Sequence, residues 1–210
     1  MNIWNIENNF YLKSDTSRLK KAICQFEVFK KSSNVQGSIV ECGVFKGASL
    51  VRLLTFRDLF KNSRKKKVIG FDPFGKFPKP KRKDDQMFAE THDKETGLGI
   101  NKKRLEKFLK KKKFTNFKLI KGDLLSTLPN FLNKNKKLKI SFLHLDMDVY
   151  APTKYALENL FNKVTKNGII LIDDYKGVKG ATIATNEFIK DKKLKIMNLS
   201  IDNRLSFIIK

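Results

Sequence analysis

The chain has 210 residues, of which 45 are lysine or arginine, 21 are aspartate or glutamate and two are cysteine, and its formal net charge is +24. This length suits a single domain with one substantial core, which we expect over residues 1–210. The sequence has no apolar run near the roughly 20 residues that cross a bilayer, no basic-then-apolar secretion signal and no cysteine spacing of a disulfide scaffold or zinc site, so we expect a cytoplasmic protein without membrane contact.

The first predicted element is a helical cap over residues 1–36, with an amphipathic helix from Ser17 to Lys31 that covers the cofactor side of a sheet or an oligomer surface. Five short apolar runs follow, separated by stretches with apolar residues three and four positions apart. Strands that alternate with helices predict a parallel sheet with helices on both faces. The predicted strands are Ser38–Cys42, Lys67–Phe71, Phe117–Lys121, Lys139–Leu145 and Gly168–Ile172.

Residues 75–99 interrupt this alternation between the second and third strands. The segment contains Pro78 and Pro80, a cluster of lysine and arginine, and then the polar string AETHDKETG. It is too long for an ordinary connection in a compact domain, and loops of this length are typically lids or binding loops, or else disordered. We expect a mobile lid loop here.

The end of the chain departs from the parallel pattern. A helix over Ala181–Lys190 precedes two predicted strands, Leu194–Leu199 and Leu205–Ile209, which are typical of a closing antiparallel hairpin. The complete prediction is an α/β fold, in which a seven-stranded, mostly parallel, Rossmann-like sheet ends in this hairpin and carries helices on both faces.

Ligands of an open parallel sheet bind beyond the carboxyl ends of its strands. The first strand ends in Glu41, and the two glycines that follow, Gly43 and Gly47, open the turn into the next helix. Glycine there lets a ligand approach the backbone. The G-x-x-x-G spacing is shorter than the dinucleotide fingerprint, and by itself it is equally consistent with close packing.

Two more carboxylates follow the second and third strands. Asp72 stands where nucleoside-binding sheets place an acid that accepts hydrogen bonds from a ribose diol. Asp123 lies at the same edge, but the pattern Asp-Leu-Leu-Ser-Thr-Leu also fits the N-cap of a helix. Both interpretations of Asp123 stay open at this point.

The fourth and fifth strands end in Leu-Asp-Met-Asp and Ile-Asp-Asp, which bring Asp146, Asp148, Asp173 and Asp174 to one edge. Like charges packed together cost free energy unless a cation compensates, and hard divalent ions such as Mg²⁺ bind through carboxylate oxygens. Any one of these side chains alone could instead face solvent or cap a helix. The set as a whole predicts a divalent metal site.

The chain has only two histidines, too few to favour a zinc site. His144 lies inside an apolar strand, where a packed core residue is expected. His92 lies in the predicted lid, where it serves as a base, as a substrate contact or as a solvated loop residue.

Three stretches together resemble one family. They are Val40–Ser49 (VECGVFKGAS), Leu143–Thr153 (LHLDMDVYAPT) and Gly168–Tyr175 (GIILIDDY). Their order and content are similar to the macrocin O-methyltransferase family, and the resemblance extends from about Gly37 to Ile189. It implies the class I fold of S-adenosyl-L-methionine-dependent methyltransferases and methyl transfer to a sugar hydroxyl.

The resemblance also implies roles for individual residues. The first motif, with Glu41, Gly43, Gly47 and Ser49, lies around the methionine part of the cofactor. Asp72 holds the cofactor ribose, and Asp123 stands near the adenine, where the family usually has an aromatic residue. The metal-binding carboxylates are Asp146, Asp173 and Asp174, which hold Mg²⁺ or Mn²⁺ beside two neighbouring sugar oxygens.

Proton removal falls to Asp146 or His92 under the same resemblance. The implied partner is a small glycan or glycoside acceptor, and the number of subunits stays open, with a homo-oligomer allowed. A divalent metal could equally hold the two adjacent oxygens of a catechol-like acceptor, so this alternative stays open. A nucleic-acid-binding protein or RNA methyltransferase on the same sheet is the alternative from another class. The diffuse spread of lysine and the acidic strand edge disfavour it.

Overall fold

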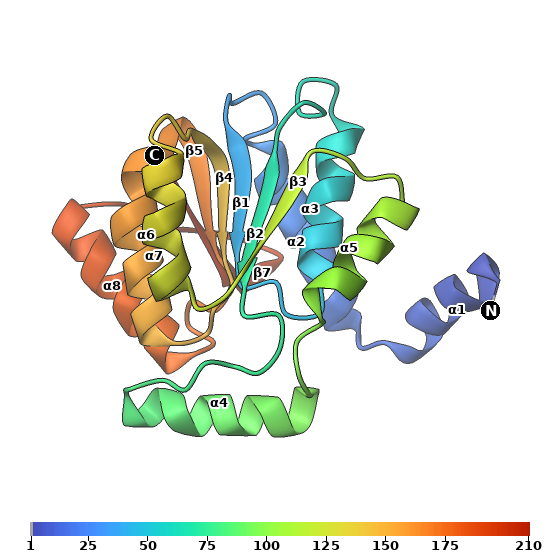
Figure 1. The fold of residues 1–210 in the computed structure, drawn as a ribbon, viewed down its shortest axis with the longest axis horizontal. Helices are drawn as coiled ribbons and strands as arrows, with labels where there is room; N and C mark the ends of the chain where they lie inside the picture. The colour runs from blue at the N-terminus through green and yellow to red at the C-terminus, as the bar shows by residue number, and fades with distance from the viewer. Residues whose placement is uncertain (1) are drawn as a thin grey trace.

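A computed structural model describes residues 2–210, apart from the side chains of residues 202–204. Seven strands form one sheet in the order β3-β2-β1-β4-β5-β7-β6 (Figure 1). The first five strands are parallel, and β7 pairs antiparallel with both β5 and β6. The strands are β1 Ser38–Cys42, β2 Val68–Asp72, β3 Phe117–Lys121, β4 Ile140–Leu145, β5 Val164–Ile172, β6 Met197–Leu199 and β7 Asp202–Ile209.

This architecture confirms the predicted fold class. The five parallel strands and the closing hairpin lie within a few residues of their predicted bounds, except that β5 begins at Val164. The prediction missed this early start because Thr165, Lys166 and Asn167 are polar and hide the strand from an apolar pattern.

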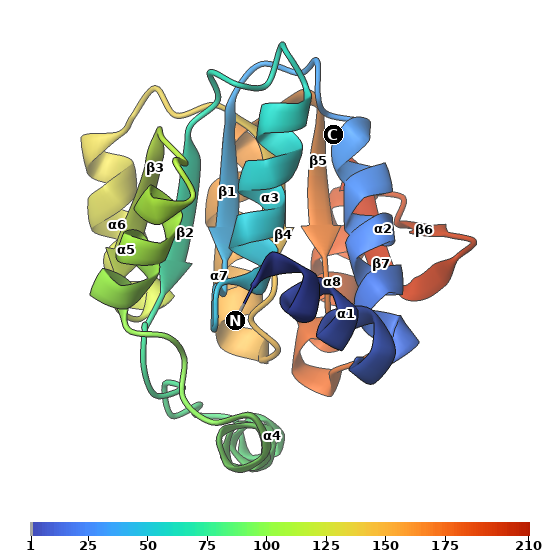
Figure 2. The same ribbon diagram turned by 90° about the vertical axis from the view of Figure 1, so that its right-hand side faces the viewer.

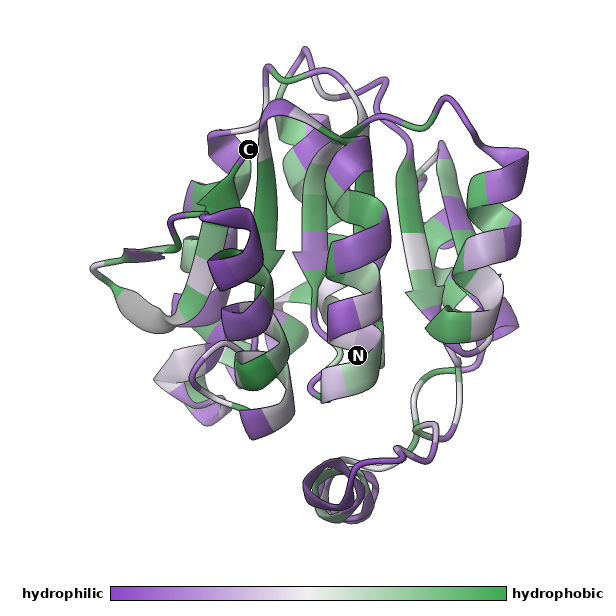
Figure 3. Ribbon diagram, turned by 90° about the vertical axis from the view of Figure 1, so that its left-hand side faces the viewer, coloured by the Kyte–Doolittle hydropathy of each residue, from purple (hydrophilic) through white to green (hydrophobic). Residues whose placement is uncertain are grey.

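Alternation along the strands divides the core into two layers. In β1, Val40 and Cys42 pack toward one face while Ile39 packs toward the other. Helices α6, α7 and α8 cover the first face, and α2, α3 and α5 cover the second (Figures 1 and 2). The strands are largely hydrophobic, as buried parallel strands must be (Figure 3). The helices are α2 Thr16–Lys30, α3 Ala48–Leu59, α5 Lys102–Lys111, α6 Leu124–Lys134, α7 Tyr150–Leu160 and α8 Lys179–Lys192.

The N-terminal segment contains two helices rather than one. Helix α2 lies close to the predicted helix and packs against α3 and β7. Helix α1, Ile3–Lys13, has no buried residue and extends away from the sheet (Figure 1). Within residues 2–210, no helix combines the length and the apolar character that a membrane span requires.

The predicted loop over residues 75–99 is corrected by the structure. Lys83–Thr96 form helix α4, which lies beyond the carboxyl ends of the parallel strands (Figure 1). Asp84 and Asp85 stand in its first turn, where acidic side chains stabilise the positive end of the helix dipole. The buried residues of this helix are Asp85 and Ala89. Its sequence therefore lacks apolar residues at spacings of three and four, which is the pattern used to predict helices.

Both ends of α4 are attached to the strand edge. The buried carboxylate of Asp85 accepts a hydrogen bond from the Tyr150 backbone N–H at 3.0 Å, at the start of α7. Lys179 pairs with Asp84 at 3.0 Å, and Lys46 donates to the Thr96 carbonyl at the other end. Any role of α4 as a lid therefore involves a docked helix rather than a free loop.

Lys66 is a buried lysine far from the strand edge. Its ammonium donates to the Ser32 and Ser33 carbonyls, each at 2.9 Å, and no acidic side chain among those described offsets the loss of hydration. Burial therefore lowers the pKa of Lys66 to about 8. The two carbonyls also accept hydrogen bonds from Val35 N–H and Ser63 O–H, so they keep partners without the lysine.

Lys66→Met is expected to remove a pH dependence of stability. Between pH 8 and 10.5 the folded state binds fewer protons at this site than the unfolded state, so the unfolding free energy of the wild type should rise with pH relative to the variant, by at most about 1.4 kcal/mol per pH unit. Urea unfolding at several pH values measures this difference. The exposed Lys65→Met variant is the matched control, and an equal response of both variants would refute the assignment.

Candidate active site

The turn after β1 approaches the end of β4 too closely for any side chain. Gly43 has φ +92°, and a Cβ there would lie 1.7 Å from the Asp146 carbonyl oxygen. Gly47 has φ +88° at the N-cap of α3, against the Leu105 side chain. Glycine is therefore required at both positions for conformation and for space. Ser49 follows in the first turn of α3 and is buried.

Asp72 fixes the shape of this turn. One oxygen accepts hydrogen bonds from the Val44 and Phe45 backbone N–H groups, both at 2.8 Å, and the other accepts from Phe74 N–H at 2.5 Å. Phe45 and Phe74 have φ of 51° and 52°, the left-handed region that side chains rarely adopt. Burial raises the pKa of Asp72, although the three hydrogen bonds oppose this. The carboxylate thus holds two strained turns at the strand edge.

The four predicted carboxylates of β4 and β5 do meet. Oxygens of Asp146, Asp148 and Asp174 lie within 4.8 Å of one another, and Asp146 and Asp173 form a second group of the same size with His144. Asp174 also accepts a hydrogen bond from the Asp148 N–H at 3.1 Å, and Asp148 has φ +63°. The metal-site residues that the sequence predicts therefore lie together.

A buried chain of polar side chains supports this cluster from inside the sheet. Glu41 and His144 are neighbours in the β1–β4 register, both fully buried, and His144 Nδ1 lies 2.9 Å from the Glu41 carboxylate. On its other side, His144 Nε2 lies 3.7 Å from Asp173. Burial alone would lower the pKa of His144, but Asp173 and Glu41 outweigh it and raise the pKa to about 10.

Lys21 enters the cluster from α2. Its ammonium pairs with Asp173 and lies 3.8 Å from Asp146 Oδ2. Burial alone would lower the pKa of Lys21, but the carboxylates of Asp146 and Asp173 raise it. Burial would likewise raise the pKa of Asp173, but His144 and Lys21 together lower it.

The cluster still has a surplus of negative charge. Burial raises the pKa of Asp146 well above its usual value, with Asp173 adding to the effect, and burial together with Asp148 does the same for Asp174. In addition, Asp173 Oδ1 is a buried acceptor that has no hydrogen-bond partner among the described residues. These features indicate a site that lacks positive charge.

Two predicted site residues lie apart from the cluster. Asp123 is exposed and caps α6 by accepting the Leu125 N–H at 3.0 Å, so the N-cap interpretation is confirmed. His92 lies on α4 with its ring near those of Phe45, Phe77 and Phe88, at centroid distances of 5.1, 5.6 and 5.8 Å. An electrostatic interaction links it to Asp148 of the cluster.

The sequence interpretation missed the contributions of Lys21 and His144. Glu41 and His144 are ionisable residues inside two apolar strands, and this pattern could have predicted their pairing, because residues of neighbouring strands can face each other inside a sheet. Lys21 gave no signal of its own, because it is one of many lysines and its partners are distant in sequence.

The sequence of the chain was compared with models of known protein families. The sequence model of the macrocin O-methyltransferase (TylF) family matches residues 16–210. The chain belongs to this family. It is therefore an S-adenosylmethionine-dependent O-methyltransferase, as the three motifs predict. No curated protein sequence gave a match.

Solved structures of similar fold include other methyltransferases. CalS11, a calicheamicin methyltransferase, is 20% identical with a TM-score of 0.82, and the alignment covers 100% of this chain and 86% of CalS11. The O-methyltransferase NovP is 21% identical with a TM-score of 0.75, over 91% and 79% of the two chains. MycE of the mycinamycin pathway, solved with Mg and S-adenosylhomocysteine, is 16% identical with a TM-score of 0.52, over 88% of this chain and 47% of MycE. These likenesses confirm the class I methyltransferase fold.

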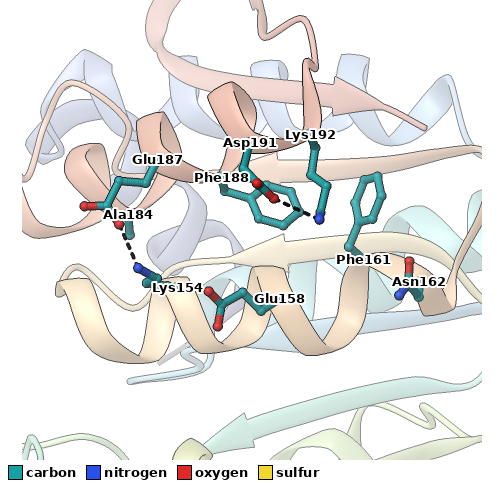
Figure 4. A pocket seen from close by; sticks show the side chains of 9 residues that line it. All are labelled: Lys154, Glu158, Phe161, Asn162, Ala184, Glu187, Phe188, Asp191 and Lys192. Carbon is teal, nitrogen blue, oxygen red and sulfur yellow. Dashed lines mark hydrogen bonds and ion pairs between the residues drawn. The ribbon is translucent and has the colours of Figure 1, made fainter.

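A surface groove of this methyltransferase lies apart from the carboxylate cluster. Side chains of α7 and α8 line it, among them Lys154, which pairs with Glu187 at 2.8 Å, and Asp191, which pairs with Lys192 at 2.8 Å (Figure 4). It contains none of the predicted site residues. The groove is a charged seam between two helices, apart from the methyltransferase site.

Gly43→Ala is expected to disturb both halves of the methyltransferase site, because the new methyl group would displace the backbone of Asp146. We expect a loss of unfolding free energy of about 1–3 kcal/mol and weaker binding of S-adenosylhomocysteine. Urea unfolding and calorimetric titration measure the two effects. Gly75→Ala is the control, since its methyl group would meet no heavy atom within 4 Å. Equal behaviour of the two variants would contradict this account.

Proposed function

We propose that this methyltransferase transfers the methyl group of S-adenosyl-L-methionine to a hydroxyl of a sugar or glycosylated small molecule, with the help of Mg²⁺ or Mn²⁺. The observation that carries the proposal is that Asp146, beside the turn at Gly43, belongs to two groups of possible metal ligands, one with His144 and Asp173 and one with Asp148 and Asp174. An acceptor hydroxyl placed beside Asp146 would lie next to the cofactor turn. The family and the TDP-rhamnose 3'-O-methyltransferase activity of CalS11 favour a sugar acceptor.

The residues present fit a divalent cation. Carboxylate oxygens are the ligands that Mg²⁺ prefers, and the metal would be held by Asp146, Asp173 and Asp174. The raised pKa values of Asp146 and Asp174 and the unpartnered Asp173 Oδ1 are the signs of missing positive charge that such an ion would supply. MycE, which shares the fold, was solved with Mg.

The bound metal would orient the acceptor hydroxyl and lower its pKa. Methyl transfer breaks the sulfur–carbon bond of the cofactor and forms a carbon–oxygen bond, while the hydroxyl proton passes to a base. We assign this base to Asp146, because it lies at the junction of the cofactor turn at Gly43 and the acidic cluster, where an acceptor hydroxyl would have to be placed. Its backbone is fixed by a 2.9 Å hydrogen bond from its N–H to the Cys42 carbonyl, which favours a constant distance to the acceptor.

Asp72 and the turn that it holds would bind the cofactor. The carboxylate keeps lone pairs beyond its three backbone hydrogen bonds, and these could accept from the ribose hydroxyls. Glu41 is fully buried and paired with His144, so its role in cofactor binding would be to shape the strand end rather than to touch the cofactor. His92 of α4 lies among the rings of Phe45, Phe77 and Phe88, and we assign it a contact with the acceptor rather than proton transfer.

Asp146→Asn and Asp173→Asn are expected to lower kcat by roughly 100-fold or more, because they remove the base or a metal ligand. The affinity for S-adenosylhomocysteine should stay within about threefold of the wild type, since neither residue is assigned to the cofactor. Transfer of radiolabelled methyl groups and calorimetric titration measure the two quantities. Asp191→Asn, on the exposed end of α8, is the control. Undiminished turnover in either site variant would remove the metal hypothesis.

Asp72→Ala is expected to weaken cofactor binding and to leave metal binding intact, the reverse of what is expected for Asp173→Asn. It should weaken S-adenosylhomocysteine binding by at least tenfold, because the turn at Val44 and Phe45 loses its acceptor and the ribose loses a partner. Metal binding at β4 and β5 should persist, as followed by Mn²⁺ titration. If the cofactor affinity of the variant equals that of the wild type, Asp72 has no role in the cofactor site.

The acceptor class can be tested by one screen. Nucleotide-linked sugars, simple glycosides, catechols and RNA are each offered with labelled S-adenosyl-L-methionine, with Mg²⁺ or with EDTA. Methylation of a sugar that EDTA abolishes supports the proposal. Transfer to a catechol alone would favour the catechol-like alternative, and transfer to RNA would favour a nucleic-acid substrate.

A further inference from the structure

We propose that Lys21 is a displaceable internal cation that competes with the divalent metal for the carboxylates of Asp146 and Asp173. This inference rests on the proposed metal site and assigns a residue that tunes its affinity. Lys21 would hold the acidic cluster together when the metal is absent, and it would weaken metal binding to a level at which the ion can exchange.

Lys21 lies against the carboxylates that would hold the metal. Its side chain reaches from α2 to the carboxyl ends of β4 and β5 and pairs with Asp173, while its ammonium lies 3.8 Å from Asp146 Oδ2. A metal bound to the same two carboxylates would meet this ammonium at close range. Two cations that share carboxylate oxygens repel one another, so each lowers the affinity of the other.

Lys21 and His144 are the two cationic side chains that approach the group of four aspartates at the ends of β4 and β5 among the described residues, and there Asp173 Oδ1 is buried without a hydrogen-bond partner. Asp146, Asp148 and Asp174 also form a ligand group beside the lysine. Lys21 therefore neutralises only part of the negative charge of the cluster, which can still bind a cation of higher charge.

Lys21 lies on a partly exposed stretch of α2, from which its ammonium can be displaced. The Lys21 side chain is 31% exposed, and Leu19 and Ile23, its neighbours two positions away on α2, are 39% and 44% exposed. The flexible lysine stem can therefore move its ammonium into solvent without unpacking the core. Asp173, in contrast, is 3% exposed and fixed by its strand, so the carboxylates stay while the lysine leaves.

Metal affinity without turnover is the decisive test. Mn²⁺ is titrated into the protein with saturating S-adenosylhomocysteine, and free Mn²⁺ is followed by electron paramagnetic resonance. We expect Lys21→Met to bind Mn²⁺ at least tenfold more tightly than the wild type. Lys31→Met removes the same charge from the exposed end of α2 and should match the wild type within about twofold. Lys21→Gln, which keeps a hydrogen-bond donor without the charge, should resemble Lys21→Met.

Thermal unfolding gives a second measurement. In EDTA, Lys21→Met should melt at a lower temperature than Lys31→Met, because the carboxylates lose their internal cation, and Mn²⁺ should raise its Tm more than that of the wild type. Equal or weaker Mn²⁺ binding by both Lys21 variants, with the wild type binding normally, would overturn the competition alone. If no variant binds Mn²⁺ above the level of Asp173→Asn, the proposed metal site fails, and this inference fails with it.

Discussion

The compensation of buried charge at the ends of β4 and β5 is the constraint on which the site depends. A buried ion without a partner costs several kcal/mol, so each charged group here needs a neighbour from another element. Glu41 of β1 faces His144 of β4, His144 approaches Asp173 of β5, and Asp173 pairs with Lys21 of α2. Three strands and a helix must therefore keep one relative position. A shift of one residue in β1 or β4 would turn Glu41 or His144 to the opposite face.

The cofactor turn is coupled to this cluster through backbone contact. Gly43 packs on the Asp146 carbonyl, and Asp72 holds the residues that follow Gly43. The position of the assigned base is thus set by the same turn that would bind the cofactor. Methyl transfer demands a constant distance between the methyl donor and the acceptor oxygen, and a rigid link between the two half-sites is a direct way to provide it.

The sequence predicted most of the sheet, and the gathering of the acidic residues at its edge, for a common physical reason. Buried parallel strands leave continuous apolar runs, and the acids that follow them stand out, as at Asp72 and Asp146. Helix α4 escaped prediction because it buries little and is held by its ends, through Asp85 in particular. Lys21 and His144 escaped because their roles come from partners across the sheet, which no local pattern records.

The overall charge of the chain cannot replace these local partners. At physiological ionic strength, charges farther apart than about 8 Å are largely screened, so most of the lysine excess does not act on the carboxylates of the strand edge. Only groups within a few ångströms, such as Lys21 and His144, compensate them, which explains how a chain of net charge +24 retains an acidic site. The compensation is incomplete, and in the proposed metal site the remaining negative charge would set the affinity for a divalent ion.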